Sequence, residues 1–442
     1  MKFNKWTLGL AAVGVVSLAS AARADEKMNA LQTALSNTTI SGYVSASFNL
    51  QLSPGGGNAW SGGSPNSPAG YIPFQGETKQ DGFNLDVVKL SIAKPQDESP
   101  WAAGYQIDLL FGPDAVGYNP SANGAGGQAS RVGSIINESP FGSGADFAIK
   151  QAYIALRTPV GNGIDWKIGV FDSIIGYEVF DAGSNPNYTR SWGYWMEPTE
   201  LTGVLASYKI NDEWAVSAGI ANTLMAGINA RNDSSGYADG VGSFWHKAYV
   251  ASLTYTAPSS WGWAAGSSIY GGIEYGFSNG NYYGGGDVPS DVHHGGNQVN
   301  YYAGATMNTP WKQLTTGVAF DYVYNLFGGD IADWANAWDL GLYATFKATD
   351  KLSFNARGEY LEGTYYYVGG AESSGGGYND NAMELTGTVE YDLWANVVSR
   401  LEIRWDHFLS SEAGGGQYLA EAVDSVDHQT AVGVYANIIY KF

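Results

Sequence analysis

The chain has 442 residues, of which 14% are charged, against about 25% in a typical globular protein. The composition is apolar and aromatic, with 60 glycines, 30 tyrosines and 15 tryptophans, and it excludes intrinsic disorder. The net charge of −20 excludes nucleic-acid binding by phosphate neutralisation. Only one apolar run approaches the ~20 residues of a spanning helix, which excludes a polytopic helical membrane protein, and the lack of cysteine excludes disulfides and thiolate chemistry.

The apolar run lies at the amino terminus and is organised like a secretory signal. Lys2 and Lys5 precede an apolar stretch at 8–22, and Ala22-Arg23-Ala24 forms a small-x-small cleavage site. We therefore expect residues 1–24 to be a signal peptide, 25–38 to form a short periplasmic segment, and 39–442 to form the folded body. An uncleaved membrane anchor is the alternative interpretation of the run.

Residues 39–52 alternate between apolar and polar side chains. Ile40, Val44 and Phe48 occupy even positions, while Ser45 and Asn49 occupy odd positions. Such alternation is typical of a strand with one apolar and one wet face. A soluble sandwich would bury the apolar face against a second sheet, whereas a membrane barrel would turn it toward lipid.

Compact turn signals divide the rest of the chain at intervals of 40 to 64 residues. They lie at Pro95-Gln96-Asp97, Gly161-Asn162-Gly163, Asn211-Asp212-Glu213, Pro258-Ser259-Ser260, Asn308-Thr309-Pro310, Thr349-Asp350-Lys351 and 392–396. Each interval has room for two strands and one long loop, so seven turns join fourteen strands, and the first and last strands make sixteen. Short turns at one end and long loops at the other are typical of an outer-membrane antiparallel β-barrel.

The segment 400–406 places four ionisable side chains on one face of a strand. Arg400, Glu402, Arg404 and Asp406 alternate with apolar residues. An unpaired ion in a sandwich core costs several kcal/mol, so this face suits a water-filled lumen. The outer face of a soluble sheet is the alternative.

Aromatic residues gather at the predicted strand ends, where an amphipathic ring can lie at the level of the lipid headgroups. Among them are Trp101, Trp166, Tyr208, Trp214, Trp261, Trp263, Trp311, Tyr324, Tyr360, Tyr391 and Trp394. The final strand places apolar or aromatic residues at every second position up to Phe442. This ending resembles the signal that the barrel assembly machinery reads in outer-membrane barrels.

The chain resembles the β-barrel porin-2 family, also called OmpL-like. The resemblance rests on the signal, on Ile40-Ser41-Gly42-Tyr43-Val44, on Leu90-Ser91-Ile92-Ala93-Lys94-Pro95 and on Tyr440-Lys441-Phe442. It implies a pore in the outer membrane of a Gram-negative-type bacterium. We expect contact with lipid and lipopolysaccharide, and we expect a homotrimer. It implies no cofactor and names no solute.

The third long loop, 172–198, is the candidate constriction. It carries Glu178, Asp181 and Arg190 among several aromatic residues, and in many sixteen-stranded porins the equivalent loop folds into the lumen. A diffusion pore selects ions through fixed charges at its narrowest point. Packing at the rim or in a subunit contact is the alternative for this loop.

Charged residues on the predicted strands supply the wall of the lumen. The bases are Arg157, Lys167, Arg357, Arg400 and Arg404, and the acids are Glu359, Glu384, Glu390 and Glu402. We hypothesise that acids on the loop face bases on the wall and create a transverse field that orients dipolar solutes. Local cross-strand salt bridges along the wall are the alternative.

Other chemistry has weaker signals. His407 could serve a lipase-type site at the rim, and His293-His294 could touch a metal, but neither has a recognisable partner. Asp330, Asp333 and Asp380 match no calcium-loop spacing. We therefore predict a non-enzymatic barrel for passive diffusion of small hydrophilic solutes and ions. A secreted or surface β-protein that binds glycans, and a lipase-type barrel, are the alternatives.

Overall fold

The computed structural model describes residues 37–52, 79, 81–115, 147–224, 228–229, 247–277, 297–324, 336–366, 377–409 and 430–442. The predicted signal peptide, nearly all of the predicted periplasmic segment, and the His293-His294, Asp330 and Asp333 candidates lie outside these residues. No helix among the described residues is long and apolar enough to cross a membrane.

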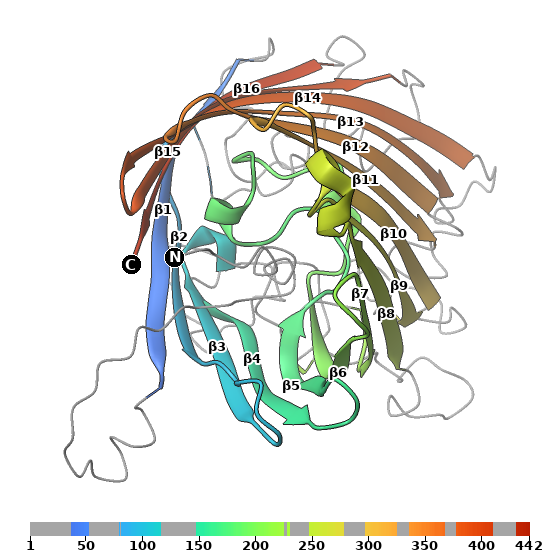
Figure 1. The fold of residues 1–442 in the computed structure, drawn as a ribbon. Helices are drawn as coiled ribbons and strands as arrows, with labels where there is room; N and C mark the ends of the chain where they lie inside the picture. Colours follow the sequence, from blue (N-terminus) through green and yellow to red (C-terminus); the bar gives the residue numbers. More distant parts are fainter. Residues whose placement is uncertain are drawn as a thin grey trace.

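Sixteen antiparallel strands form one closed barrel, in which each strand pairs with its neighbours in sequence (Figure 1). They are β1 (Thr39–Gln51), β2 (Gly82–Lys94), β3 (Ala103–Phe111), β4 (Phe147–Thr158), β5 (Ile164–Asp172), β6 (Glu200–Lys209), β7 (Trp214–Ala221), β8 (Ala248–Thr256), β9 (Ser268–Phe277), β10 (Asn297–Asn308), β11 (Leu314–Tyr324), β12 (Asn336–Lys347), β13 (Leu352–Tyr366), β14 (Gly377–Trp394), β15 (Val397–Phe408) and β16 (Thr430–Lys441). The strand count is the predicted one, and all seven predicted turns separate the expected strands.

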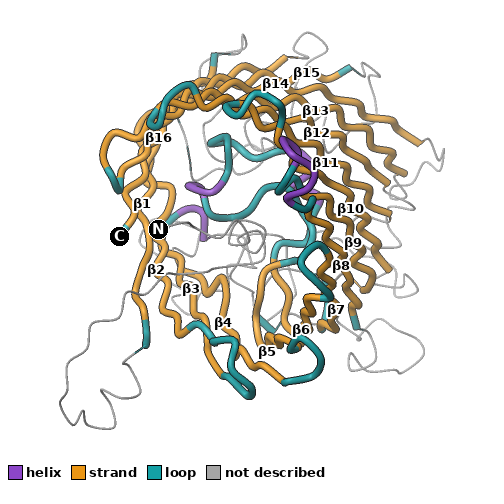
Figure 2. The backbone as a smooth tube through the Cα atoms, in the orientation of Figure 1, coloured by secondary structure: helices purple, strands orange, loops and turns teal. Residues whose placement is uncertain are grey.

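Short helical segments occur between the strands. They are η4 (Pro113–Ala115), η6 (Ala182–Ser184), α2 (Trp192–Met196) and η7 (Ser259–Ala264). Of these, η6 and α2 belong to the segment between β5 and β6, whose course inside the ring of strands is visible in Figure 2.

The barrel closes where β1 pairs with β16. The backbone N–H of Gly42 donates to the carbonyl of Phe442, and the N–H of Phe442 donates to the carbonyl of Gly42, both at 3.0 Å. Gly42 is required here because a Cβ would collide with the carbonyl of Lys89 and lie 2.8 Å from the Phe442 ring. Closure leaves no unpaired strand edge in the sheet.

The two faces of the sheet have opposite chemistry. Large apolar side chains point outward and are exposed, such as Ile154, Leu342 and Leu401, while their polar neighbours point inward. An exposed belt of this kind would be costly in water and is what lipid covers. Six of the predicted interfacial aromatics are exposed tryptophans beside the short turns: Trp101, Trp214, Trp261, Trp263, Trp311 and Trp394. Tyr360, predicted at a strand end, instead lies near the middle of β13.

The strands differ in length around the barrel, so the wall is lower on one side. Strands β5 to β9 have 8–10 residues each, whereas β10 to β16 have 11–18. A strand needs about 9–11 residues to cross a bilayer, so β5 to β9 only just span it.

Candidate pore constriction

The segment 172–198, which we call the constriction loop, lies inside the barrel (Figures 1 and 2). Most of its aromatic side chains are buried or half-buried, among them Phe180, Tyr188 and Trp192, while Trp195 is exposed. Two rings dock on tyrosines of the wall: Tyr177 stacks on Tyr343 with centroids 4.1 Å apart, and Tyr188 tilts against Tyr435 at 5.7 Å. These contacts position the loop against the strands.

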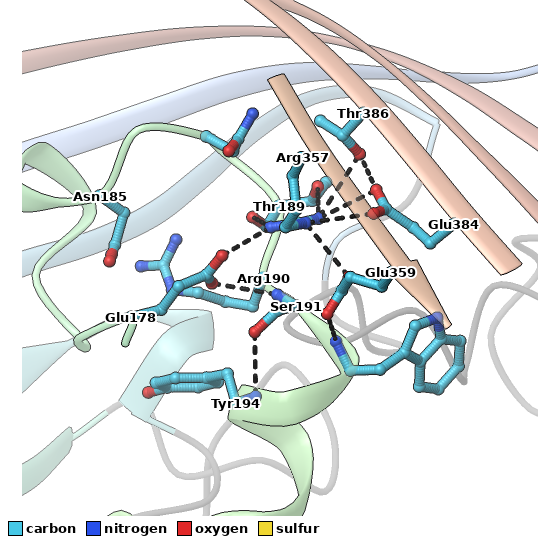
Figure 3. Close-up of polar contacts among 12 residues, drawn as sticks. Glu178, Asn185, Thr189, Arg190, Ser191, Tyr194, Arg357, Glu359, Glu384 and Thr386 are labelled. Carbon is cyan, nitrogen blue, oxygen red and sulfur yellow. Dashed lines mark hydrogen bonds and ion pairs between the residues drawn. The ribbon is translucent and has the colours of Figure 1, made fainter. Parts of the chain in front are cut away.

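Arg357 of β13 makes the central ion pair between loop and wall (Figure 3). Its Nη1 lies 2.7 Å from Oε1 of Glu178 and also donates to the carbonyl of Thr189 at 2.9 Å. Glu384 and Glu359 lie within 3.2 Å of the same guanidinium. A guanidinium presents five N–H donors in a planar fork, which suits this convergence of acceptors.

The two arginines of β15 bind the backbone of the loop. Arg400 donates to the carbonyls of Ala182 and Asn185, each at 2.7 Å, while Glu390 pairs with its Nε at 2.7 Å. Arg404 donates to the carbonyl of Arg190 at 2.5 Å and pairs with Asp406 at 2.7 Å. Both arginines are thus occupied by loop carbonyls and wall acids.

Glu402 holds the loop by accepting from its amides. The backbone N–H groups of Tyr188 and Thr189 donate to its two oxygens at 2.6 and 2.9 Å, and the Thr189 hydroxyl donates at 2.6 Å. Thr388 of β14 completes the set at 2.7 Å. Strands β13 to β15 therefore bind the loop through hydrogen bonds, with arginines as donors and a carboxylate as acceptor.

Two carboxylates of the loop that pair with lysines of β2 and β4 remain in contact with water. Asp181 pairs with Lys89 of β2 at 2.7 Å, and Asp172 pairs with Lys150 of β4. The side chains of Asp172 and Asp181 are 42% and 38% exposed, whereas those of Lys150 and Lys89 are 2% and 7% exposed. The negative member of each pair is therefore the one in contact with water, while the positive member is covered.

Helix α2 packs on the strands β11 to β13. The hydroxyl of Ser191 caps it by accepting from the amide of Tyr194 at 3.0 Å. The amide of Trp192 donates to Glu359 at 2.8 Å, and its indole N–H donates to Asp406 at 3.0 Å. The helix is thereby joined to both β13 and β15.

Glu197 follows α2 directly and meets a second acid. Its carboxyl hydrogen bonds with Asp321 of β11. Lost hydration and then the neighbouring Asp321 raise the pKa of Glu197 well above its usual range.

The structure brings most of the predicted site residues together but separates two. Glu178, Asp181, Arg357, Glu359, Glu384, Glu390, Arg400, Glu402 and Arg404 all lie at the junction of loop and wall. Arg190 braces the loop internally by donating to the carbonyls of Tyr188 and Phe180. Arg157 instead pairs with Asp165 at 2.7 Å near the turn 161–163, and Lys167 lies 4.8 Å above the ring of Tyr153.

Several residues of the site were missed from the sequence: Lys89, Lys150, Asp172, Asp321 and Asp339. Asp321 and Asp339 share the inward parity of their strands, alternating with outward Phe320 and Leu340. That parity is readable in the sequence and could have identified both. The bulge at Lys150, where Asp108 pairs with Gln151 and Leu109 with Ile149, breaks the alternation that would have revealed it.

His407 faces outward, as its parity predicts. Its Nδ1 lies 2.9 Å from the hydroxyl of Thr430, and its ring stacks on Trp405 with centroids 5.4 Å apart. These contacts give His407 a structural setting on the outer wall.

The comparisons with known proteins agree with this architecture. Residues 37–442 match the profile of the family described as "Putative beta-barrel porin-2, OmpL-like". No curated protein sequence matches the chain.

Solved structures similar in fold are outer-membrane channels and proteins. They include an anion-selective porin from Comamonas acidovorans (11% identity, 92% of this chain and 99% of that chain, TM-score 0.55) and the channel DcaP of Acinetobacter baumannii (10%, 92% and 97%, 0.52). The trimer form of OmpT from Vibrio cholerae is also similar (11%, 92% and 99%, 0.52). At these identities the likeness concerns the fold.

Proposed function

The chain belongs to the β-barrel porin-2, OmpL-like family and is an outer-membrane channel for solute diffusion, and from this premise we propose that the constriction loop makes the channel prefer cations. The observation that carries the proposal is the unequal exposure of the charges on that loop. Asp172 and Asp181 keep about two fifths of their side chains in contact with water, while their lysine partners are covered.

The arginines of β13 and β15 are largely shielded from a passing ion. Arg357, Arg400 and Arg404 are at most 4% exposed, and loop carbonyls and glutamates occupy their donors. A fixed charge acts most strongly on an ion when no protein lies between them. The transverse field between loop acids and wall bases is therefore reduced at Glu178 and Arg357, which touch each other.

The passage also has neutral polar walls. Paired hydroxyls line the inward face at Ser207 with Ser217 and at Tyr270 with Thr306, at 2.8 and 2.6 Å. Lys167 is a partly buried base on this side. Hydroxyl walls with two exposed carboxylates suit small hydrophilic solutes and cations rather than apolar molecules.

Reversal potential in a planar bilayer under a salt gradient tests the proposal. We expect cation preference in the unaltered protein and a clear loss of it in the double variant Asp172→Asn with Asp181→Asn. Asp212→Asn is the matched control, because this exposed carboxylate lies in a turn, 3.0 Å from Lys209. Anion preference in the unaltered protein, or an unchanged reversal potential in the double variant, would overturn the proposal.

We further propose a homotrimer that associates through the low wall formed by β5 to β9. Strands of 8–10 residues barely span the bilayer, so a neighbouring subunit would shield that wall better than lipid alone. The remaining outer surface would contact lipid and lipopolysaccharide, and Phe442 would be read by the assembly machinery. The mass of the detergent-solubilised protein, measured by sedimentation, tests the subunit number, and a monomer would contradict the trimer.

A further inference from the structure

Four carboxyl side chains meet beneath helix α2, and we call them the carboxyl clasp: Glu197 from the constriction loop, Asp321 from β11, Asp339 from β12 and Glu359 from β13. Asp321 and Asp339 are direct cross-strand partners. Both point inward and are at most 5% exposed. Like charges directly opposite one another destabilise a strand pair, so this arrangement needs a compensating charge.

Hydrogen bonds within the clasp require protons. Glu197 hydrogen bonds with Asp321, and Asp339 hydrogen bonds with Glu359. An ionised carboxylate can only accept a hydrogen bond. A proton shared within each pair would let one carboxyl O–H donate to the other and would relieve the repulsion between the directly opposed Asp321 and Asp339.

The clasp supports the backbone of α2 from below. A Cβ on Gly193 would lie 2.7 Å from Oδ2 of Asp321 and 3.3 Å from Oδ2 of Asp339. Glycine at this position lets the first turn of the helix lie close to the two aspartates, since a larger residue would have to displace their carboxyl groups. The amide of Trp192 reaches Glu359, the fourth member, at 2.8 Å.

The charges around the clasp do not neutralise it. Glu178, Glu274 and Glu384 are the neighbouring acids, and Arg357 and Arg404 are the neighbouring bases. Arg357 lies 3.2 Å from Glu359 but also pairs with Glu178 and Glu384, and Arg404 is bound by Asp406. These two bases are shared among more acids than they can balance.

A metal ion does not fit as the balancing charge. Among the described residues, no group of three or more His, Asp or Glu side chains is placed to hold one. Oδ1 of Asp339 is buried without a hydrogen-bond partner. Protons shared between the carboxyls would balance the clasp without another charged group.

We propose that the carboxyl clasp is a proton-dependent latch, which holds α2 against β11 to β13 while protons are shared and releases α2 into the passage when they are lost to lumen water. The docked state binds more protons than the released state, so a rise in pH favours release. This agrees with the raised pKa of Glu197. The latch rests on the proposed function, since it acts on the loop that narrows the pore.

Thiol labelling of α2 tests the latch directly, because the natural chain has no cysteine. Met196 is 2% exposed and the adjacent Trp195 is 40% exposed. We compare maleimide labelling rates of the single variants Met196→Cys and Trp195→Cys in the folded protein from pH 5.5 to 8.5. The rate for Met196→Cys divided by the rate for Trp195→Cys corrects for ionisation of the thiol. We expect this ratio to rise with pH, by up to about tenfold per pH unit for one linked proton.

Amide replacements in the clasp identify the groups responsible. Glu197→Gln or Asp321→Asn supplies an N–H donor that needs no titratable proton, so the labelling ratio should become independent of pH. Asp165→Asn is the matched control, because Asp165 pairs with Arg157 at the far end of the lumen, and the rise should persist. A ratio independent of pH with the clasp intact, or a rise that survives Glu197→Gln, would overturn the latch.

A second measurement needs no substitution. Open-channel current noise of the unaltered protein should increase over the same pH range if α2 is released, and constant noise would contradict the latch. Failure of the pore is distinguishable from failure of the latch. A protein that labels as expected but carries no current would refute the channel and leave the latch standing.

Discussion

Nη1 of Arg357 lies 2.7 Å from Oε1 of Glu178, although 179 residues separate them in sequence and neither side chain is exposed to solvent. The contact joins β13 to the constriction loop at its most enclosed point. Glu359 and Glu384 approach the same guanidinium, so three carboxylates depend on one base. Removing Arg357 should therefore strongly lower the stability of the folded protein.

Arg357→Met should destabilise the folded protein by about 3–5 kcal/mol, because it leaves buried carboxylates without their counter-charge. Unfolding in urea from lipid vesicles, followed by the heat-modifiable shift on gels, measures the loss. Arg157→Met is the matched control. Arg157 and Asp165 form a partly exposed pair, so we expect less than about 1 kcal/mol there. Equal effects of the two variants would contradict the central role of Arg357.

Glu402→Gln should loosen the loop without opening the barrel. Two backbone amides and a hydroxyl of the loop donate to this carboxylate, and the Gln amide group can accept through only one of its two terminal atoms. We expect a loss of about 1–3 kcal/mol from the unsatisfied loop donor, seen as increased open-channel noise. Glu390→Gln disturbs one contact, with Arg400, and should give a smaller change. Noise unaltered by Glu402→Gln would show that the loop is held by other contacts.

Leu342→Arg should report the lipid contact of the outer wall. Leu342 is 57% exposed near the middle of β12, and an arginine on the lipid face at the bilayer midplane costs about 2–4 kcal/mol. Met307→Arg, close to the turn at the end of β10, should cost about 0–1 kcal/mol. Folding free energies in vesicles give both values. If the two substitutions cost the same, the outer face would not experience a depth-dependent environment.

The strands and short turns were predictable because their signals are local. Alternation along 39–52 and turn residues such as Gly161-Asn162-Gly163 depend on neighbours in sequence, and sixteen strands follow from counting them. The inward and outward faces of β15 also follow from parity, with Arg400 and Arg404 inward.

The docking of the constriction loop was not predictable in the same way. Its partners on β13 and β15 are about 170 to 220 residues distant, and no periodic pattern encodes such contacts. Helix α2 has only five residues, too few for a helical repeat to be visible. The opposition of Asp321 and Asp339 depends on the strand register, which a sequence of alternating residues does not specify.

The reciprocal hydrogen bonds between Gly42 and Phe442 have a consequence for biogenesis. The first strand finds its second neighbour only in β16, so the ring cannot close before β16 has been made and has paired. Until then β1 exposes a bare edge that could recruit other chains. A chain that lacks β16 would therefore form an open ribbon with two bare edges, which other chains could pair with.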